Sequence, residues 1–220
     1  MILWQWMLGM IFPARCVLCD KILEKWETDL CRDCRLHAPE CTMSESKRNF
    51  LDSWLALWYY EDKVRESVMR FKFYRRRSKA EIYGRLLAGK LREKHPEGLD
   101  LLVWIPVSRL RKWHRGYDQV ELLAHAVGCE LDMKPENIVK KIRDNPPQSK
   151  IVGEAQRRAN VLGVYRLTDP ALVQGKRLLL LDDVITTGAT ASEVARVLKT
   201  AGAKEVHFGA VAAARRGQNK

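Results

Sequence analysis

Aliphatic runs of strand length alternate along the chain with segments whose apolar residues recur at helical spacing. The predicted strands are 54–60, 99–106, 178–181 and 206–214, and the predicted helices are 62–73, 79–93, about 120–127 and about 190–201. Parallel strands need crossover connections of this kind, usually helices. The pattern therefore predicts an α/β fold, a mostly parallel sheet with flanking helices.

The chain begins with an apolar stretch, MILWQWMLGMIF, which is too short to span a bilayer and lacks the features of an export signal. We expect a short helix packed on the body, and Trp4 and Trp6 make peripheral membrane contact the alternative. The expected compartment is the cytoplasm. A polar connector at 42–53 separates the two predicted domains, a cysteine module at 1–45 and an α/β domain at 46–220.

Length and charge narrow the partners of the protein. The 220 residues are 46% hydrophobic, which suffices for one sizeable core and a small additional module. The formal net charge of +12 at pH 7 favours an acidic partner, either a polyphosphate ligand or a nucleic acid. The choice between these two classes depends on the motifs.

Two C-x2-C pairs lie close together near the start of the chain. They contain Cys16, Cys19, Cys31 and Cys34. Each pair places two thiolates on one tight turn at the spacing that tetrahedral zinc needs, and two pairs complete a structural site. Disulfides are disfavoured in a reducing compartment, and a redox pair is disfavoured because two such motifs lie in a loop-rich segment. His37 and Cys41 are spaced as alternative ligands, and Cys129 is predicted as a core residue on an apolar helix face.

The stretch LLLLDDVITTGATASEVARVL joins a buried strand, two carboxylates, a hydroxyl-rich turn and a helix. The turn contains Thr186, Thr187, Gly188, Ala189 and Thr190. At the carboxyl edge of a parallel sheet, such a turn can hold a phosphate on backbone N–H groups. Asp182 and Asp183 only accept hydrogen bonds, so hydroxyl groups or a metal ion must lie between them and the phosphate. A ribose 5-phosphate meets both demands, whereas no P-loop or dinucleotide motif is present.

The same stretch looks like the PRPP-binding motif of type I phosphoribosyltransferases. Together with the two C-x2-C pairs, RFKFYRRR, IPVSRLRKWHRGYDQ and PPQSKIVGEAQRRANVLGVYRL, it makes nearly the whole chain resemble the ComF/ComFC family. The resemblance implies a zinc-ribbon module joined to a phosphoribosyltransferase-like domain, with a part in uptake of single-stranded DNA during natural transformation. Two positions depart from the family pattern: Cys41 stands where many members carry a further CxxC, and Asp118 replaces the usual Asn.

The resemblance also implies roles for individual residues. Asp182 and Asp183 become a catalytic pair that holds the ribose hydroxyls, and the turn that follows them binds the 5-phosphate. Ser108, Arg109 and Arg115 join the PRPP-binding set, at the place where such enzymes hold pyrophosphate and magnesium. The further matches are Gly116, Tyr117, Gln119, Gln148, Arg157 and Asn160. The implied cofactors are structural zinc, and Mg²⁺ with PRPP. Catalysis in that class rests on positioning and electrostatics, without a side-chain nucleophile.

Basic residues interleaved with aromatic residues indicate nucleic-acid contact, because cations follow a single-strand backbone while rings stack on bases. The candidate contacts are Arg75, Arg76, Arg77 and Trp113. The alternative places Phe71 and Phe73 in the core and the arginines on a solvated face or around pyrophosphate. Two hypotheses follow. One is a PRPP-binding factor that works with single-stranded DNA and the DNA-uptake machinery, without an integral membrane segment. The other is an active phosphoribosyltransferase, a pentosyl glycosyltransferase, on an unidentified base or acceptor.

Overall fold

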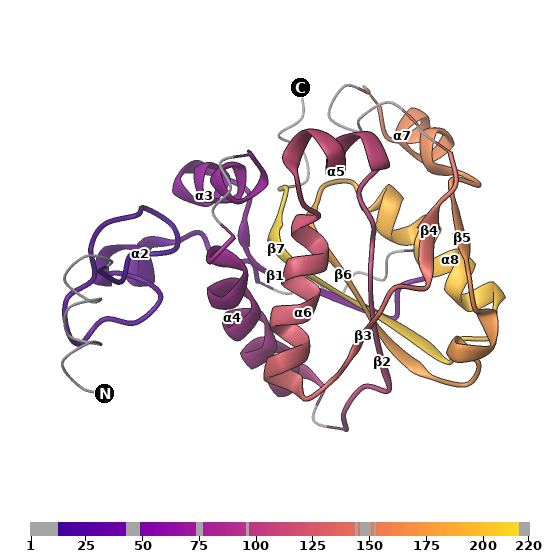
Figure 1. The fold of residues 1–220 in the computed structure, drawn as a ribbon, viewed down its shortest axis with the longest axis horizontal. Helices are drawn as coiled ribbons and strands as arrows, with labels where there is room; N and C mark the ends of the chain where they lie inside the picture. Colours follow the sequence, from indigo (N-terminus) through magenta and orange to yellow (C-terminus); the bar gives the residue numbers. More distant parts are fainter. Residues whose placement is uncertain are drawn as a thin grey trace.

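A five-stranded parallel sheet forms the centre of the protein (Figure 1). The computed structural model describes residues 13–42, 49–73, 77–95, 97–143, 145, 151 and 153–215. The strand order is β1-β7-β6-β2-β3, and every neighbouring pair is parallel. The strands are β1 (Ser53–Tyr59), β2 (Leu101–Trp104), β3 (Pro135–Glu136), β6 (Arg177–Ile185) and β7 (Glu205–Ala213). This sheet and its helices confirm the predicted α/β class.

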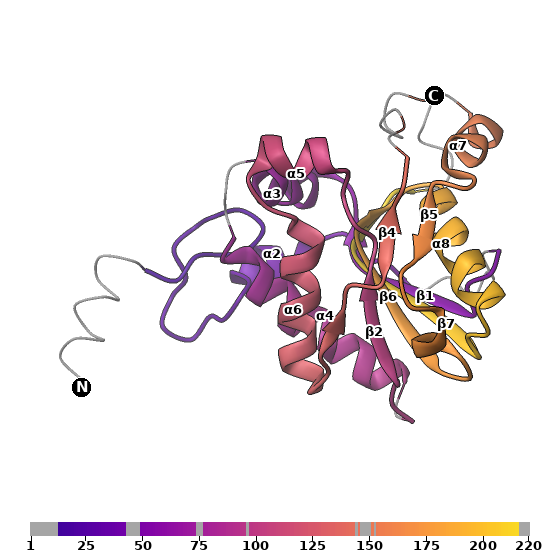
Figure 2. The same ribbon diagram turned by 45° about the vertical axis from the view of Figure 1, so that its right-hand side comes forward.

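Helices cover both faces of the sheet (Figures 1 and 2). One face carries α3 (Asp62–Phe73), α4 (Lys79–Lys94) and α6 (Gln119–Leu131), and the other carries α8 (Ala189–Thr200) with the antiparallel pair β4 (Val139–Lys141) and β5 (Tyr165–Leu167). The remaining helices are α2 (Arg32–His37), α5 (Arg109–Arg115), α7 (Glu154–Val161) and the 3-10 helix η2 (Pro170–Val173). Alternate residues of β6 face the two layers: Leu179 and Leu181 pack with α4 and α6, whereas Leu178 and Leu180 pack with α8.

Strand β6 extends beyond the aliphatic run that predicts it. It continues to Ile185 because its pairing with β7 continues, with Asp182 opposite Ala210 and Ile185 opposite Ala213. Both aspartates therefore lie inside the strand, near its carboxyl end. Since successive strand residues point to opposite faces, Asp183 points toward α3 and α6, and Asp182 points toward α8.

Cys129 is exposed, so its prediction as a core residue is wrong. Helix α6 buries a stripe that includes Val120, Leu123, Ala124 and Val127. Cys129 follows Val120 by nine residues, which at 3.6 residues per turn is about two and a half turns. It therefore lies on the side of the helix opposite the buried stripe.

The cysteine-rich segment packs against α3 and α4, to one side of the sheet (Figure 1). Val17 and Leu18, which lie between the first two cysteines, are buried in the same apolar cluster as Val68 and Tyr83. The predicted helix at 1–12 with Trp4 and Trp6, the boundary at residue 45, Arg75, Arg76 and Gln148 lie outside the described residues. None of the described helices is both long and apolar enough to cross a bilayer.

Candidate functional site

A cavity of about 780 Å³ lies at the carboxyl edge of the sheet. The end of β6 and the turn before α8 line it, together with the loop after β2, helix α5 and one side of α3. Strands end and helices begin at this edge, which is where ligands bind in open parallel sheets. The volume is that of a site for a small-molecule ligand.

Asp183 is buried at this edge, and two polar side chains from separate helices contact its carboxylate. Lys72 Nζ, near the end of α3, lies 2.8 Å from Asp183 Oδ1. Gln119 Nε2, at the start of α6, donates a hydrogen bond to Asp183 Oδ2 at 2.6 Å. Arg115 in turn donates to Gln119 Oε1 at 2.8 Å and so orients the amide. The carboxylate is therefore held in one orientation, with a cation beside it.

Asp182 is half-buried and accepts a hydrogen bond from the backbone N–H of Asp183 at 2.8 Å. Its burial, together with the adjacent carboxylate of Asp183, raises the pKa of Asp182 well above its ordinary value. On the same face, burial and the carboxylate of Asp182 raise the pKa of Tyr165. Hydroxyl donors or a cation from a ligand would favour the ionised form of Asp182. The pair suits a ligand that brings such groups.

The turn between β6 and α8 lines the cavity with Thr186, Thr187, Gly188, Ala189 and Thr190. Gly188 is the N-cap residue of α8, and its φ of 81° lies in the left-handed region that favours glycine. The first turn of α8 contains no acidic residue, so the positive end of the helix dipole at the cavity is not offset locally. An anion is the ligand that this turn favours.

Asp118 ties the loop after β2 to the start of α6. Its Oδ1 accepts hydrogen bonds from the backbone N–H groups of Val120 and Glu121, at 2.9 and 3.2 Å. Its Oδ2 accepts from the backbone N–H of Val107 at 3.1 Å. Asparagine has one oxygen and could not accept all three in this arrangement, so the departure from the family pattern has a structural role here. The loop also places Ser108 on the cavity wall.

The cavity is lined by more cations than anions. Its basic residues are Arg65, Lys72, Arg111, Arg115 and Lys141, and its acidic residues are Asp182 and Asp183. Among the described residues, five positive and two negative side chains leave an excess of three positive charges. Within the described part of the chain, Arg65 and Arg111 have no carboxylate at ion-pair distance. This balance favours a polyanionic ligand.

Helical spacing decides which predicted basic residues line the cavity. Arg115 does, whereas Arg109 does not. Arg111 and Arg115 are four residues apart and share a side of α5, and Arg109 lies on another side. Arg157 and Asn160 of α7 do not line the cavity, and Arg157 Nε donates to a backbone carbonyl of the preceding loop at 2.8 Å.

The sequence prediction gave no role to four of the five described lining cations, which are Arg65, Lys72, Arg111 and Lys141. Arg111 could have been found from the sequence, because it follows Ser108 by three residues and so lies one helical turn from it. At the start of α5, the backbone N–H of Arg111 donates a hydrogen bond to Ser108 Oγ. Arg65 and Lys72 could not have been found in this way, because α3 is remote in sequence from the aspartate pair and only the folded chain joins them.

The predicted nucleic-acid contacts are partly described. Trp113 is 77% exposed on α5, and the Arg77 guanidinium lies over the aromatic ring of Tyr117 in the α5–α6 turn, 5.0 Å from its centroid. Phe71 is fully buried, as the core alternative predicts, whereas Phe73 is half exposed. The described part of this predicted surface therefore contains one exposed ring, Trp113, and one cation, Arg77, that packs on the buried ring of Tyr117.

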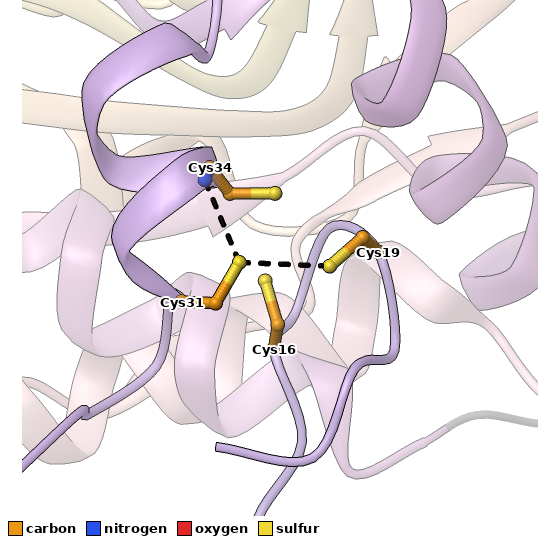
Figure 3. A group of neighbouring side chains, drawn as sticks. All are labelled: Cys16, Cys19, Cys31 and Cys34. Carbon is orange, nitrogen blue, oxygen red and sulfur yellow. Dashed lines mark hydrogen bonds between the residues drawn. The ribbon is translucent and has the colours of Figure 1, made fainter. Parts of the chain in front are cut away.

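The four paired cysteines form a compact group (Figure 3). Their Sγ atoms all lie within 4.8 Å of one another, and those of Cys19 and Cys31 are 3.7 Å apart. A tetrahedral zinc ion with Zn–S bonds of about 2.3 Å separates its sulfur ligands by about 3.8 Å. The backbone N–H of Cys34 donates to Cys31 Sγ at 3.5 Å. The residues therefore fit a tetrahedral metal ion.

The two alternative ligands lie apart from this group. His37 is exposed and contacts Asp33 of the preceding turn. Cys41 is buried in the apolar cluster on the α8 face of the sheet, whereas the paired cysteines belong to the other cluster. The geometry favours the four paired cysteines as the ligand set.

Buried polar contacts fasten the first cysteine pair to the main domain. Lys79 at the start of α4 lies 2.8 Å from the Asp20 carboxylate, and Arg70 of α3 lies 3.1 Å from its other oxygen. The backbone carbonyl of Val17 accepts hydrogen bonds from Lys79 and from Ser67 of α3. The turn with the first cysteine pair is thus held by α4 and by α3, the helix that also carries Lys72 into the cavity.

Comparison with known proteins finds a match to one domain family and similarities that extend over most of the chain. The phosphoribosyl transferase domain model matches residues 120–220. Competence protein F of Haemophilus influenzae is 26% identical over 92% of this chain and 98% of that protein. DNA utilization protein YhgH of Salmonella typhi is 34% identical over 63% of this chain and 62% of that relative. Competence protein ComFC of Streptococcus pneumoniae is 29% identical over 86% and 77%.

Among solved structures, glutamine phosphoribosylpyrophosphate amidotransferase from B. subtilis matches 65% of this chain and 30% of that chain, with 21% identity and a TM-score of 0.43. The sheet, the domain match and the cavity at its carboxyl edge define a protein with a phosphoribosyltransferase-like domain. Within the proteins that have such a domain, the likeness to the competence proteins is the more specific one, because it extends over most of the chain. The chain is similar over most of its length to the competence proteins F and ComFC, and it is also similar to the YhgH proteins.

Proposed function

We propose that the protein binds PRPP or a related phosphoribosyl ligand in the cavity and assists the uptake or handling of single-stranded DNA. One observation carries the ligand half of the proposal. A phosphate-compatible turn, a pair of carboxylates and an excess of cations converge in one cavity. A phosphorylated sugar with free hydroxyls and a second anionic group complements all three.

In the proposed complex, each part of the ligand meets a different element. The 5-phosphate occupies the turn from Thr186 to Thr190, and the ribose hydroxyls donate to Asp182 and Asp183. The second anionic group lies near Ser108 and the cations of α5. Mg²⁺ would neutralise that group when it is pyrophosphate. No covalent protein intermediate is needed, since positioning and charge complementarity supply the binding.

The test is calorimetric titration of the purified protein with PRPP, with and without Mg²⁺. We expect saturable binding that strengthens with Mg²⁺. Ribose 5-phosphate and pyrophosphate, titrated separately, should each bind more weakly than PRPP, because each engages only part of the site. Absence of PRPP binding under both conditions would reject the ligand proposal, and only the DNA proposal would then remain.

Matched variants locate the ligand. Thr190→Val removes a hydroxyl from the turn, and Thr200→Val makes the same change at the far end of α8, outside the cavity. We expect only the first to weaken PRPP binding, by about tenfold for one lost hydrogen bond to a charged group. Asp183→Asn should weaken it further. Equal effects of the two threonine changes would place the ligand elsewhere.

The second candidate function is a working phosphoribosyltransferase. The acid pair and the PRPP-compatible turn favour it, and Mg²⁺-dependent release of pyrophosphate in the presence of candidate bases would establish it. Asp182→Asn tests in cells whether the ligand site is needed for function. Loss of function in that variant would support a role for the ligand site, and full function would assign the role to another surface.

The DNA half of the proposal rests on the net charge of +12 and the exposed Trp113 among basic residues. Affinity for single-stranded DNA should fall steeply with salt, and should weaken when Arg75, Arg76 and Arg77 are replaced by alanine. Alanine at Lys90, Arg92 and Lys94, near the end of α4, is the control with equal loss of charge. Unchanged affinity in the first triple variant would remove its arginines from the binding surface.

We also propose that the four paired cysteines hold one structural zinc ion. Elemental analysis of the purified protein should find about one equivalent of zinc, and Cys31→Ser should lose it. Cys129→Ser, at the exposed cysteine of α6, is the matched control. Metal-free protein with an unchanged fold and stability would contradict this assignment.

A further inference from the structure

Helix α3 has one side in the core and another on the cavity. The side in the core consists of Val64, Ser67, Val68 and Phe71, all buried. The side on the cavity consists of Arg65, Met69, Lys72 and Phe73. These last four positions have the spacing i, i+4, i+7 and i+8, which places them on one side of a helix. We name them the α3 wall.

Two members of the α3 wall are large apolar side chains that face the cavity without being covered. Met69 is 36% exposed and Phe73 is 51% exposed. The Arg115 guanidinium lies 4.6 Å from the Phe73 ring centroid, so that the ring already packs against a cation. A methionine and an aromatic ring at the edge of a polar cavity provide a surface on which a flat ligand can pack.

The other two members of the α3 wall are cations. Arg65 has no carboxylate partner within the described residues, and Lys72 pairs with Asp183. Asp182 and Asp183 are the only acids among the described residues that line the cavity, and both lie on β6. A neutral flat ligand would leave Arg65 without an anion, and an aliphatic anion would leave the apolar pair uncovered. A planar group with a negative charge matches all four residues.

The α3 wall lies on the other side of the aspartate pair from the turn before α8. The contact between Lys72 and Asp183 places the wall beside the strand. Helices α3 and α8 belong to the apolar clusters on opposite faces of the sheet. A ligand held by the turn and by the aspartates therefore has its far end toward the α3 wall.

We propose that the α3 wall is a half-site that selects a planar, negatively charged group, with a heterocyclic carboxylate as its simplest occupant. The proposal deepens the proposed function and rests on it for the first ligand, since the wall adjoins the aspartates to which the ribose is assigned. Arg65 and Lys72 determine the charge preference, and Met69 and Phe73 determine the preference for a ring.

Paired ring compounds test this charge preference directly. Orotate and uracil differ by one carboxylate, and nicotinate and nicotinamide have a carboxylate and its neutral amide on the same ring. Each compound is titrated calorimetrically into the protein alone and into protein saturated with PRPP. We expect at least one carboxylate to bind about tenfold or more tightly than its neutral partner, the gain from one charge-assisted contact.

Variants on a single helix identify the source of the preference. Arg65→Met and Lys72→Met should each reduce the affinity for the carboxylate about tenfold and leave the affinity for the neutral partner unchanged. Lys63→Met is the matched control, because Lys63 lies on α3 but pairs with Asp33 outside the cavity. Arg65 is exposed, so its variant is expected to fold even if Lys72→Met does not.

The outcomes separate the half-site from the PRPP proposal. PRPP binding without a preference for either carboxylate would overturn the half-site and leave the proposed function intact. A carboxylate preference that depends on Arg65, in protein that does not bind PRPP, would support the half-site and reject the PRPP proposal. If no ring compound binds and Arg65→Met weakens binding of a single-stranded oligonucleotide, the wall belongs to a nucleic-acid surface and the inference is overturned.

Discussion

Replacing Lys79 with methionine should loosen the cysteine module from the main domain. The Lys79 ammonium is almost fully buried, with 6% of its side chain exposed, and lies 2.8 Å from Asp20. It also donates to the Val17 carbonyl and lies 3.3 Å from Ser67 Oγ. Methionine has a similar length but no charge or donor, so Lys79→Met removes these three contacts without opening a large cavity.

The structure sets the size of the effect. Removing one partner of a buried ion pair costs about 3–5 kcal/mol when the other charge is left unpaired. Asp20 is not left unpaired, because Arg70 Nε lies 3.1 Å from its Oδ2 and 28% of the Asp20 side chain is exposed. The Val17 carbonyl also keeps Ser67 as a donor. We therefore expect a loss of about 2–3 kcal/mol in the free energy of unfolding, which is less than the cost of leaving a buried charge without any partner.

Urea denaturation measures this loss, and the rate of zinc transfer to a chromogenic chelator reports the module itself. Lys79→Met should release the proposed zinc ion faster than wild type, since the turn with the first cysteine pair loses its anchor. Lys63→Met, at the exposed pair with Asp33, should change neither quantity measurably. A change in unfolding free energy below about 0.5 kcal/mol, with normal zinc release, would refute the view that Lys79 anchors the module.

Two further predictions concern the packing of α4 and the titration of the acid pair. Gly84→Ala would place a methyl group 2.5 Å from Ala126 Cβ on α6. Thermal denaturation should therefore show that the free energy of unfolding falls by about 1–3 kcal/mol. A methyl group at Gly89 would meet no atom within 4 Å, so Gly89→Ala should raise the free energy of unfolding by up to about 1 kcal/mol. Equal effects of the two substitutions would contradict the close contact at Gly84. Burial and Asp183 raise the pKa of Asp182 in the folded state, so its contribution to stability is present at low pH and is lost as pH rises through that pKa. Asp182→Asn should therefore raise the free energy of unfolding at neutral pH, with a gain that disappears near about pH 4 in urea titrations; a gain independent of pH would contradict this.

The features that the sequence determined by itself are local or periodic. The C-x2-C spacing forces each cysteine pair onto one turn, and all four thiols do come together. The alternation of strands and helices similarly predicts a parallel sheet with its ligand edge at the strand ends, where the run from Asp182 to Thr190 lines the cavity. Short-range geometry decides these features, so residue spacing is sufficient to predict them.

Only the tertiary structure decided which distant side chains meet. No spacing relates Lys72 to Asp183, and the α3 wall lines the cavity because the end of that helix lies beside Asp183 of β6. The prediction that Cys129 is a core residue was wrong, because a helix rich in apolar residues still has a side that faces solvent. Burial and cross-chain pairing depend on how the elements pack. For this protein, the sequence therefore determined the aspartate pair, the turn and the cysteine pairs, and the packing of α3 decided what surrounds them.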